Sequence, residues 1–339
     1  MTGSLRLLHI AVGEPSPRLW TRLFRQELAR IGPLLLVPHG SSLPGEEHLR
    51  LIRECHVLIT GWGSSAIPVD VARHPGNLGY VCNVTGSVRP WVPLEVIEAG
   101  IPVTNWGDAP ANRLAEGAMT LLLATVKDLH RQIAAARGGH WQSDPRLYGG
   151  TLDRMRVGVY GLGVIGRRFV ELLRPFRADI RFYDPYVSDY PPDLIRMDSL
   201  AELFATSQSI VVHAGLSDET RHSVTAELLA LLPDLAVVVN TARGAIIDQD
   251  ALFAELACGR LRAGLDVLEP DTLPEGHPAR LWENVILSAH RIGRNPPDHY
   301  QVATWLEDYH EVCLDNLRRY ARGEPLRFRV DRDRYLRST

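Results

Sequence analysis

Lysine is almost absent from this chain of 339 residues. Lys127 is the only lysine among 37 basic residues, so the other 36 are arginines. No glycine-rich loop precedes Lys127, which excludes a Walker A phosphate loop. Schiff-base chemistry would have to use the same residue, which falls within an expected helix. A cationic group that takes part in chemistry is therefore expected to be arginine or histidine.

Long apolar runs and paired cysteines are absent as well. No stretch approaches the roughly 20 apolar residues that a membrane span needs, and the apolar run near the N-terminus is too short for a signal peptide. The four cysteines, Cys55, Cys82, Cys258 and Cys313, show no CxxC spacing, which predicts neither a disulfide framework nor a zinc site. A net charge of −3 argues against binding to nucleic acid. We therefore expect a cytoplasmic protein with no metal, nucleic-acid or membrane partner.

Short apolar runs that alternate with helical patterns occupy most of the chain. Such alternation predicts an α/β fold with doubly wound parallel sheets. The strands expected in a first series are residues 7–12, 34–37, 56–60, 80–84 and 101–107. Those expected in a second series are residues 156–160, 179–183, 209–213, 236–240, 262–266 and 284–288.

One long helix is expected between the two series. Residues 111–136 have leucines at helical spacing, and Gly138 and Gly139 follow them. At about 1.5 Å per residue such a helix would extend roughly 39 Å, enough to bridge two domains. Residues 137–154, rich in glycine, aspartate and arginine, are expected to form a loop.

A glycine motif follows the first strand of the second series. Gly161, Gly163 and Gly166 fit the pattern G-x-G-x-x-G between a predicted strand and a predicted helix. In such a motif the first glycine permits the tight turn, the second permits close approach of a pyrophosphate, and the third permits packing of helix on strand. The amides of Val164 and Ile165 would then face phosphates at the helix N-terminus.

An acidic residue stands where a dinucleotide site needs one. Asp184 ends the next predicted strand, 18 residues after Gly166. An acid about 20 residues past the glycines binds the adenosine ribose 2′-hydroxyl. Because its charge would repel a 2′-phosphate, the motif favours NAD over NADP as the cofactor.

Ionisable residues follow three of the later predicted strands. Arg243 lies in a turn after 236–240, and Asp266 ends the strand 262–266, with Glu269 and Asp271 in the loop beyond. His290 follows the last strand. Open α/β sheets bind ligands at the carboxyl ends of their strands. A fixed cation and a histidine beside a carboxylate suit carbonyl polarisation with proton transfer.

Six motifs in this order resemble those of the D-isomer-specific 2-hydroxyacid dehydrogenases. The motifs are GLGVIG (161–166), YDP (183–185), VVHAGLSDETRH (211–222), NTARGAIID (240–248), LDVLEP (265–270) and NVILSAH (284–290). The resemblance implies two Rossmann-like doubly wound domains with an interdomain active-site cleft. Residues 108–293 would form the NAD-binding domain, and residues 1–107 with 294–339 would form a discontinuous substrate domain.

The resemblance also implies roles for individual residues. Arg243 would hold the substrate carboxylate and the oxygen on C2, and His290 would exchange a proton with that oxygen. An acidic residue would orient the imidazole and raise its pKa. The residues expected at the nicotinamide half of the cofactor are Thr241, Ala242, Arg243, Asp266, His290 and Gly293.

The identity of the acidic partner is open from sequence. The family's glutamate usually stands five residues after the aspartate of the LDV motif, where this chain has Asp271; Glu269 is the alternative. Two further departures are Ala214–Gly215, where the family often has Leu-Pro, and Ala289, where proline commonly precedes the histidine. His213 is expected to fix the local backbone rather than to contact substrate.

The substrate domain has the weaker signals. By resemblance, residues 84–89 correspond to a loop that closes on substrate, and the amides of Ser87 and Val88 could bind a carboxylate. Arg89 has two alternatives, a contact with an acidic or phosphorylated substrate and a solvated surface position. Trp62 and Trp106 are candidates for lining the cleft, with ordinary packing as the alternative.

We therefore expect an NAD-dependent dehydrogenase that transfers hydride between nicotinamide and C2 of a small D-2-hydroxy or 2-oxo acid. The alternative is an NAD-sensing binding protein like the transcriptional corepressors that share this fold. The resemblance implies a homodimer formed through the NAD-binding domain, with residues 111–136 and 137–154 as candidate contact surfaces.

Overall fold

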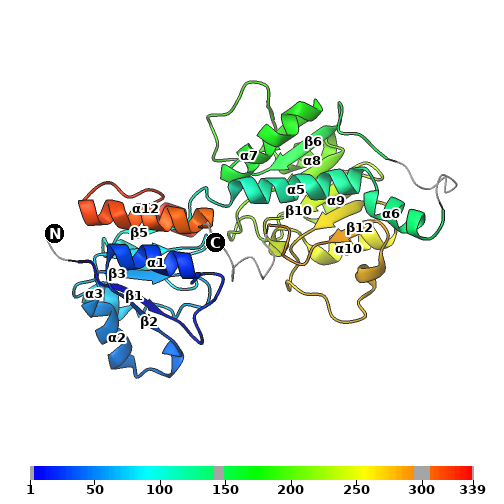
Figure 1. Cartoon of the computed structure of the whole chain (residues 1–339). Helices are drawn as coiled ribbons and strands as arrows, with labels where there is room; N and C mark the ends of the chain where they lie inside the picture. Colours follow the sequence, from blue (N-terminus) through cyan, green and yellow to red (C-terminus); the bar gives the residue numbers. More distant parts are fainter. Residues whose placement is uncertain (1–3, 141–148, 294–305, 338–339) are drawn as a thin grey trace. The chain divides into compact units, whose positions relative to one another are not determined.

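A computed structural model describes residues 4–140, 149–293 and 306–337 of the chain. The chain divides into two compact units, Met1–Pro110 with Asn295–Thr339 and Ala111–Arg294. We call the first the terminal unit, since it contains both chain ends, and the second the central unit. Each unit is an α/β fold with one parallel sheet (Figure 1).

The sheet of the terminal unit has five strands in the order β2-β1-β3-β4-β5. These strands are β1 (Leu7–Ile10), β2 (Leu34–Val37), β3 (Val57–Thr60), β4 (Tyr80–Asn83) and β5 (Val103–Thr104). The chain order reverses between β1 and β3. Such a reversal opens a crevice at the carboxyl ends of the strands, where ligands bind in open sheets.

Helices cover both faces of this sheet (Figure 1). On one face lie α1 (Arg22–Ile31) and α12 (Asp308–Arg322), whose apolar sides bury Phe24 and Leu317 against the strands. The other face is covered by α2 (Gly45–Glu54), α3 (Asp70–Arg73) and α4 (Leu94–Glu98). The last described helix is α13 (Arg332–Arg337).

The sheet of the central unit has seven parallel strands in the order β12-β11-β10-β9-β6-β7-β8. These strands are β6 (Arg156–Tyr160), β7 (Asp179–Tyr183), β8 (Ile195–Arg196), β9 (Ser209–Val212), β10 (Val237–Asn240), β11 (Arg262–Leu265) and β12 (Val285–Leu287). Its chain order reverses between β6 and β9. The glycine motif directly follows β6, one of the two strands between which the order reverses.

Two helical layers cover this second sheet (Figure 1). One layer contains α5 (Ala111–Val126) and α7 (Val164–Leu173), which pack on each other and on the sheet. The other contains α8 (Leu200–Thr206), α9 (Ala226–Ala230) and α10 (Gln249–Ala257). The hydroxyl of Thr225 and the carboxylate of Asp248 accept hydrogen bonds from first-turn amides of α9 and α10, as N-cap residues do.

The prediction of one helix over residues 111–136 is wrong. The structure has two helices, α5 and α6 (Leu129–Arg137), because Asp128 adopts a left-handed backbone with φ of 54°. Its buried carboxylate binds Arg131 at 2.9 Å. The guanidinium of Arg262 donates to the carbonyl of Thr125 at 3.1 Å, which stabilises the C-terminus of α5. Lys127 thus lies at a junction of helices rather than inside one.

The predicted strands are confirmed. The bounds of β2, β6 and β7 are as predicted, and the other predicted strands are one to five residues shorter in the structure. The sequence did not predict β8, which is only two residues long and is exposed. All four cysteines are free thiols, although the sulfur atoms of Cys82 and Cys313 are 3.2 Å apart in the terminal unit. Among the described residues, no helix has the length and apolar character to cross a membrane.

Candidate active site

The glycine motif forms a tight connection between β6 and α7. Gly161 has a φ of 95°, and a Cβ atom there would lie 2.5 Å from the amide nitrogen of Ala214. A Cβ atom on Gly166 would lie 2.2 Å from the carbonyl oxygen of Gly161. Gly163, the N-cap of α7, has open space beside it instead. The first and third glycines therefore meet protein, and the second faces space that a ligand can enter.

Asp184 lies beside this connection, directly after β7. Its Oδ2 accepts the amide of Leu162 at 2.9 Å, and its Oδ1 accepts the amide of Tyr186 at 2.9 Å. The carboxylate is thus held at the edge of the glycine turn. Each oxygen keeps a lone pair that a ribose hydroxyl could use.

Arg243 lies in a turn that Asn240 shapes. The side chain of Asn240 accepts the amide of Ala242 at 3.0 Å and donates to the carbonyl of Arg243 at 2.9 Å. The guanidinium of Arg243 donates to the carbonyl of Ala242 at 2.8 Å. Burial lowers the pKa of Arg243, and the nearby carboxylate of Asp271 opposes this shift. Thr241, at the start of the turn, is buried.

Asp266 holds the loop that carries His290. Its Oδ1 accepts the hydroxyl of Ser288 at 2.6 Å and the amides of Arg291 and Ile292 at 2.8 and 3.1 Å. Its backbone carbonyl accepts the amide of His290. The buried carboxylate therefore fixes the loop after β12 from the end of the neighbouring strand β11.

His290 contacts Asp271. The Nδ1 atom of its ring and the Oδ2 atom of Asp271 form a short hydrogen bond, while Oδ1 of Asp271 accepts the amide of Leu268 at 3.2 Å. The carboxylate of Asp271 also opposes the lowering of the pKa of Arg243, so it interacts with both the imidazole and the guanidinium. The three residues follow the adjacent strands β10, β11 and β12.

Glu269 has other partners. Its carboxylate binds Nη1 of Arg221 at 2.8 Å and Nε2 of His222 at 2.6 Å. The hydrogen bond from His222, followed by that from Arg221, lowers the pKa of Glu269. The main chain of Glu269 exchanges two hydrogen bonds with the side chain of Gln249. The two acids considered from sequence thus occupy different networks.

Two further residues considered from sequence, Gly293 and His213, pack against apolar side chains of the central unit. Gly293 packs on α5, where a Cβ atom would lie 2.8 Å from Leu114. His213 follows β9 and packs on Phe169, with ring centroids 4.9 Å apart. Burial lowers the pKa of His213 to about 3, which keeps the ring neutral.

In the terminal unit, Ser87 and Val88 lie in a turn after β4. The side chains of Asn83 and Asn105 donate to carbonyl groups of this turn. Arg89, next along the chain, donates instead to the carbonyls of Tyr335 and Leu336 at the end of the chain. Its guanidinium therefore stabilises α13, which speaks against the role in substrate binding considered from sequence.

Trp62 and Trp106 form an aromatic cluster at the same edge of the sheet. Their ring centroids are 5.9 Å apart, and that of Tyr309 lies 5.6 Å from Trp62. The guanidinium carbon of Arg18 lies 4.1 Å from the ring centre of Trp62. Both tryptophans are partly exposed, so each side chain packs within the unit and also forms part of its surface.

Comparisons with known proteins place this geometry in a family. Residues 119–291 match the sequence model of the D-isomer specific 2-hydroxyacid dehydrogenases, NAD binding domain. The chain is 30% identical over 256 residues to a hydroxypyruvate reductase of Thermotoga maritima, a match that covers 74% of this chain and 82% of the relative. This chain belongs to the D-isomer specific 2-hydroxyacid dehydrogenase family.

A second relative and a solved structure agree with this assignment. The chain is 32% identical over 289 residues to D-3-phosphoglycerate dehydrogenase of Methanocaldococcus jannaschii, covering 84% of this chain and 53% of that protein. The match thus spans about half the length of that relative. A 2-hydroxyacid dehydrogenase from Ketogulonicigenium vulgare Y25 has the same fold, with a TM-score of 0.78, 23% identity and coverage of 96% of this chain and 98% of its own.

The predicted family and the α/β fold with two parallel sheets are therefore confirmed. The family model identifies an NAD-binding domain within the central unit. The relatives are named as a reductase and a dehydrogenase, which favours enzyme activity over the NAD-sensing corepressor. Nothing in these comparisons supports the corepressor.

Ala289 gives this dehydrogenase a distinctive loop. Ala289 and His290 have φ angles of 52° and 56°, a left-handed backbone conformation that residues other than glycine rarely adopt. Proline, whose ring holds φ near −65°, cannot take this conformation. The backbone that presents His290 to Asp271 therefore excludes proline at position 289, which the sequence alone did not reveal.

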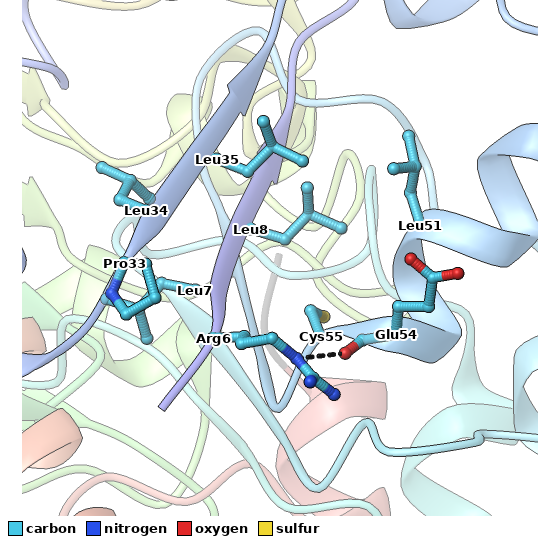
Figure 2. A pocket seen from close by; sticks show the side chains of 9 residues that line it. All are labelled: Arg6, Leu7, Leu8, Pro33, Leu34, Leu35, Leu51, Glu54 and Cys55. Carbon is cyan, nitrogen blue, oxygen red and sulfur yellow. Dashed lines mark hydrogen bonds between the residues drawn. The ribbon is translucent and has the colours of Figure 1, made fainter. Parts of the chain in front are cut away.

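A hollow of about 220 Å³ in the terminal unit does not belong to this site (Figure 2). It lies at the amino ends of β1 and β2, where Leu8, Leu35 and Leu51 line it, whereas parallel sheets bind ligands at their carboxyl ends. Arg6 closes one side by donating to the carbonyl of Glu54 at 2.8 Å. Burial raises the pKa of Cys55 in its wall to about 12, so this thiol is not a nucleophile.

Proposed function

We propose that this dehydrogenase interconverts a small 2-oxo acid and the corresponding D-2-hydroxy acid, with NAD as its cofactor. The contact between His290 and Asp271 beside Arg243 carries the proposal. These groups follow the three strands next to β9, on one side of the sheet reversal. The glycine turn and Asp184 follow the strands on its other side.

The residues around the reversal suit a dinucleotide. Its pyrophosphate would lie beside Gly163, where the first-turn amides of α7, including those of Val164 and Ile165, have no partner within the helix. The carboxylate of Asp184 would accept hydrogen bonds from the hydroxyl groups of the adenosine ribose. The bound cofactor supplies or accepts the hydride at its nicotinamide.

Preference for NAD over NADP is proposed from the charge at Asp184. The structure holds this carboxylate through two backbone amides. A 2′-phosphate would meet its negative charge, and like charges at close range disfavour binding.

The nicotinamide end of the cofactor would lie over the β10 and β11 loops. Thr241, Ala242, Asp266 and Gly293 are the proposed contacts besides Arg243 and His290. The three donors to Asp266 all bind Oδ1, and no donor among the described residues reaches Oδ2. We propose that Oδ2 accepts a hydrogen bond from the carboxamide.

Arg243 would bind the substrate carboxylate and polarise the C2 carbonyl. Its planar guanidinium can donate two parallel hydrogen bonds. Burial lowers its pKa, but arginine stays charged at neutral pH. A charge with little surrounding water stabilises the developing negative charge on the oxygen more strongly than a hydrated one.

His290 would move the proton. Because Asp271 binds Nδ1, the carboxylate orients the ring and leaves Nε2 for the substrate. Nε2 gives its proton to the oxygen as C2 is reduced, and accepts it in the reverse direction. Asp271 binds the ring and Glu269 binds Arg221 and His222, so we propose Asp271 and not Glu269 as the acidic partner.

In the terminal unit, we propose that the amides of Ser87 and Val88 bind the substrate carboxylate. Successive amides directed to one point form an anion-binding turn.

Free cysteines fit the proposed reducing environment of the cytoplasm. A homodimer through the NAD-binding domain is also proposed; part of the 137–154 loop named for that contact lies outside the described residues.

The proposed function is tested by NADH oxidation with a panel of 2-oxo acids. The panel contains glyoxylate, hydroxypyruvate, pyruvate, phosphohydroxypyruvate and branched 2-oxo acids. We expect turnover of at least one of them, and weaker activity with NADPH. Binding of NADH without turnover of any panel member, together with capture of a peptide partner, would favour a corepressor instead.

A further inference from the structure

Two buried asparagines hold the turn after β4 from beneath. Nδ2 of Asn83 donates to the carbonyl of Thr85 at 2.7 Å and to that of Ser87 at 2.9 Å. Nδ2 of Asn105, which follows β5, donates to the carbonyl of Gly86 at 2.9 Å. Three successive carbonyls therefore point toward asparagine side chains of the terminal unit.

The directions of these carbonyls determine the directions of the next amides. In a trans peptide the N–H group points opposite to the C=O group of the same plane. The one cis peptide among the described residues is Glu269–Pro270, so the turn is trans. The amides of Gly86, Ser87 and Val88 thus point away from the asparagines, and no acceptor in the described parts of the chain binds them.

The asparagines are themselves fixed. Oδ1 of Asn83 accepts the hydroxyl of Thr60 at 3.0 Å, which determines which end of its amide faces the turn. Oδ1 of Asn105 accepts the amide of Gly107 at 3.1 Å and a guanidinium nitrogen of Arg334 at 3.3 Å. Both side chains are buried, so the hydrogen bonds are protected from water.

We propose that Asn83 and Asn105 are positioning residues, which direct the amides of Gly86, Ser87 and Val88 toward the carboxylate of the 2-oxo acid. The proposal rests on the proposed function, since it names how that substrate is held. Neither asparagine touches the substrate. Each acts by keeping a carbonyl away from the anion, which would repel it, and an amide toward it.

The test compares three alanine variants. Asn83→Ala and Asn105→Ala each release carbonyls of the turn, whereas Asn316→Ala is the matched control. Asn316 is also buried in the terminal unit, and its side chain binds the main chain of Arg327 at 2.8 and 3.1 Å. All three variants lose side-chain to backbone hydrogen bonds, but Asn316 has none with the turn.

The measurements are the KM for the 2-oxo acid, the Kd of oxamate by calorimetry with NADH present, and the Kd of NADH alone. For Asn83→Ala and Asn105→Ala we expect KM and the oxamate Kd to rise about tenfold or more. The Kd of NADH should stay within about twofold, since its proposed contacts are in the central unit. Asn316→Ala should leave all three values unchanged.

An unchanged oxamate Kd in a folded Asn83→Ala or Asn105→Ala variant would overturn the proposal, and so would an equal rise in Asn316→Ala. If Asn83→Ala does not fold, Asn105→Ala decides alone, because it removes the bond to one carbonyl only. Oxamate binding needs no turnover. Failure of the wild-type enzyme to reduce any 2-oxo acid would therefore count against the proposed function and not against this inference.

Discussion

The two units of this dehydrogenase share one architecture but use the carboxyl edge of the sheet differently. In the central unit, ionisable side chains stand at this edge, among them Arg243, Asp271 and His290. In the terminal unit, the turn after β4 presents neutral groups: backbone amides that we propose Asn83 and Asn105 direct. The same parallel-sheet geometry thus presents ionisable side chains in one unit and, in our proposal, a binding turn in the other.

This difference explains why the two edges are unequally readable from sequence. A reaction step needs particular ionisable side chains, and those leave recognisable motifs. An amide can come from almost any residue, so a binding turn leaves little signal. Substitutions in the central unit should therefore affect the rate strongly, whereas in the terminal unit the supporting side chains should matter more than those of the turn.

The largest expected effect is that of Arg243→Ala. Loss of the guanidinium removes both carboxylate binding and polarisation of the carbonyl, which we expect to lower kcat/KM about a thousandfold or more. Arg243→Lys is the control, since it restores charge without the planar pair of donors and should recover only part of the loss. Near-normal kcat/KM in Arg243→Ala would contradict the assignment of the reaction to side chains of the central unit.

A second test separates the two acids. Asp271→Ala leaves His290 without its partner and should lower kcat about tenfold to a hundredfold. Glu269→Gln should keep kcat within about threefold, because Glu269 binds Arg221 and His222 instead. Steady-state kinetics with saturating NADH measure both. The reverse ranking would assign the proton-transfer partner to Glu269.

Asp184→Ala tests the cofactor end of the central unit. Without the carboxylate, the ribose hydroxyls lose their acceptor and a 2′-phosphate no longer meets a negative charge. We expect the ratio of kcat/KM for NADH to that for NADPH to fall about tenfold. A ratio equal to that of the wild type would mean that this acid does not face the ribose.

Acid should weaken the terminal unit through two buried histidines. Burial lowers the pKa of His9 and of His310 to about 4. Since the unfolded histidines have the higher pKa of 6.5, stability is complete above that value and falls as the pH drops toward 4. At pH 5 each should cost about 2 kcal/mol of unfolding free energy.

Urea unfolding at pH 7 and pH 5 measures this loss. In His310→Gln the difference between the two pH values should shrink by about 2 kcal/mol, because glutamine does not titrate. Glutamine can also keep the capping box with Glu307. A pH dependence equal to that of the wild type would show that His310 does not remain neutral in the folded unit.

The smallest effect is expected for Ser87→Ala. No hydrogen bond of the Ser87 hydroxyl occurs among the described residues, and alanine keeps the amide. KM should therefore stay within about twofold of the wild-type value. A large rise in KM would assign the substrate contact to the hydroxyl and remove the contrast between the units.

The extent of prediction from sequence follows the same physical division. Strands were predictable because buried apolar runs between turns depend on local pattern. The break at Asp128 was not, since the end of α5 is stabilised by a hydrogen bond from Arg262 to Thr125, which are 137 residues apart in the sequence. The positions of Gly161 and Asp184 followed from a motif, and Asp271 was one of two candidates from its spacing in another. The left-handed backbone of Ala289 and His290 was not predicted, because no local pattern signals it.

The most direct test of the account is the transfer of deuterium from NADH dideuterated at C4 to the product. With the 2-oxo acid that the enzyme turns over fastest, mass spectrometry should find one deuterium on C2 of a D-2-hydroxy acid. The rate of this transfer should fall about a thousandfold or more in Arg243→Ala. Product without deuterium, or no product from a folded enzyme that binds NADH, would contradict hydride transfer by the central unit.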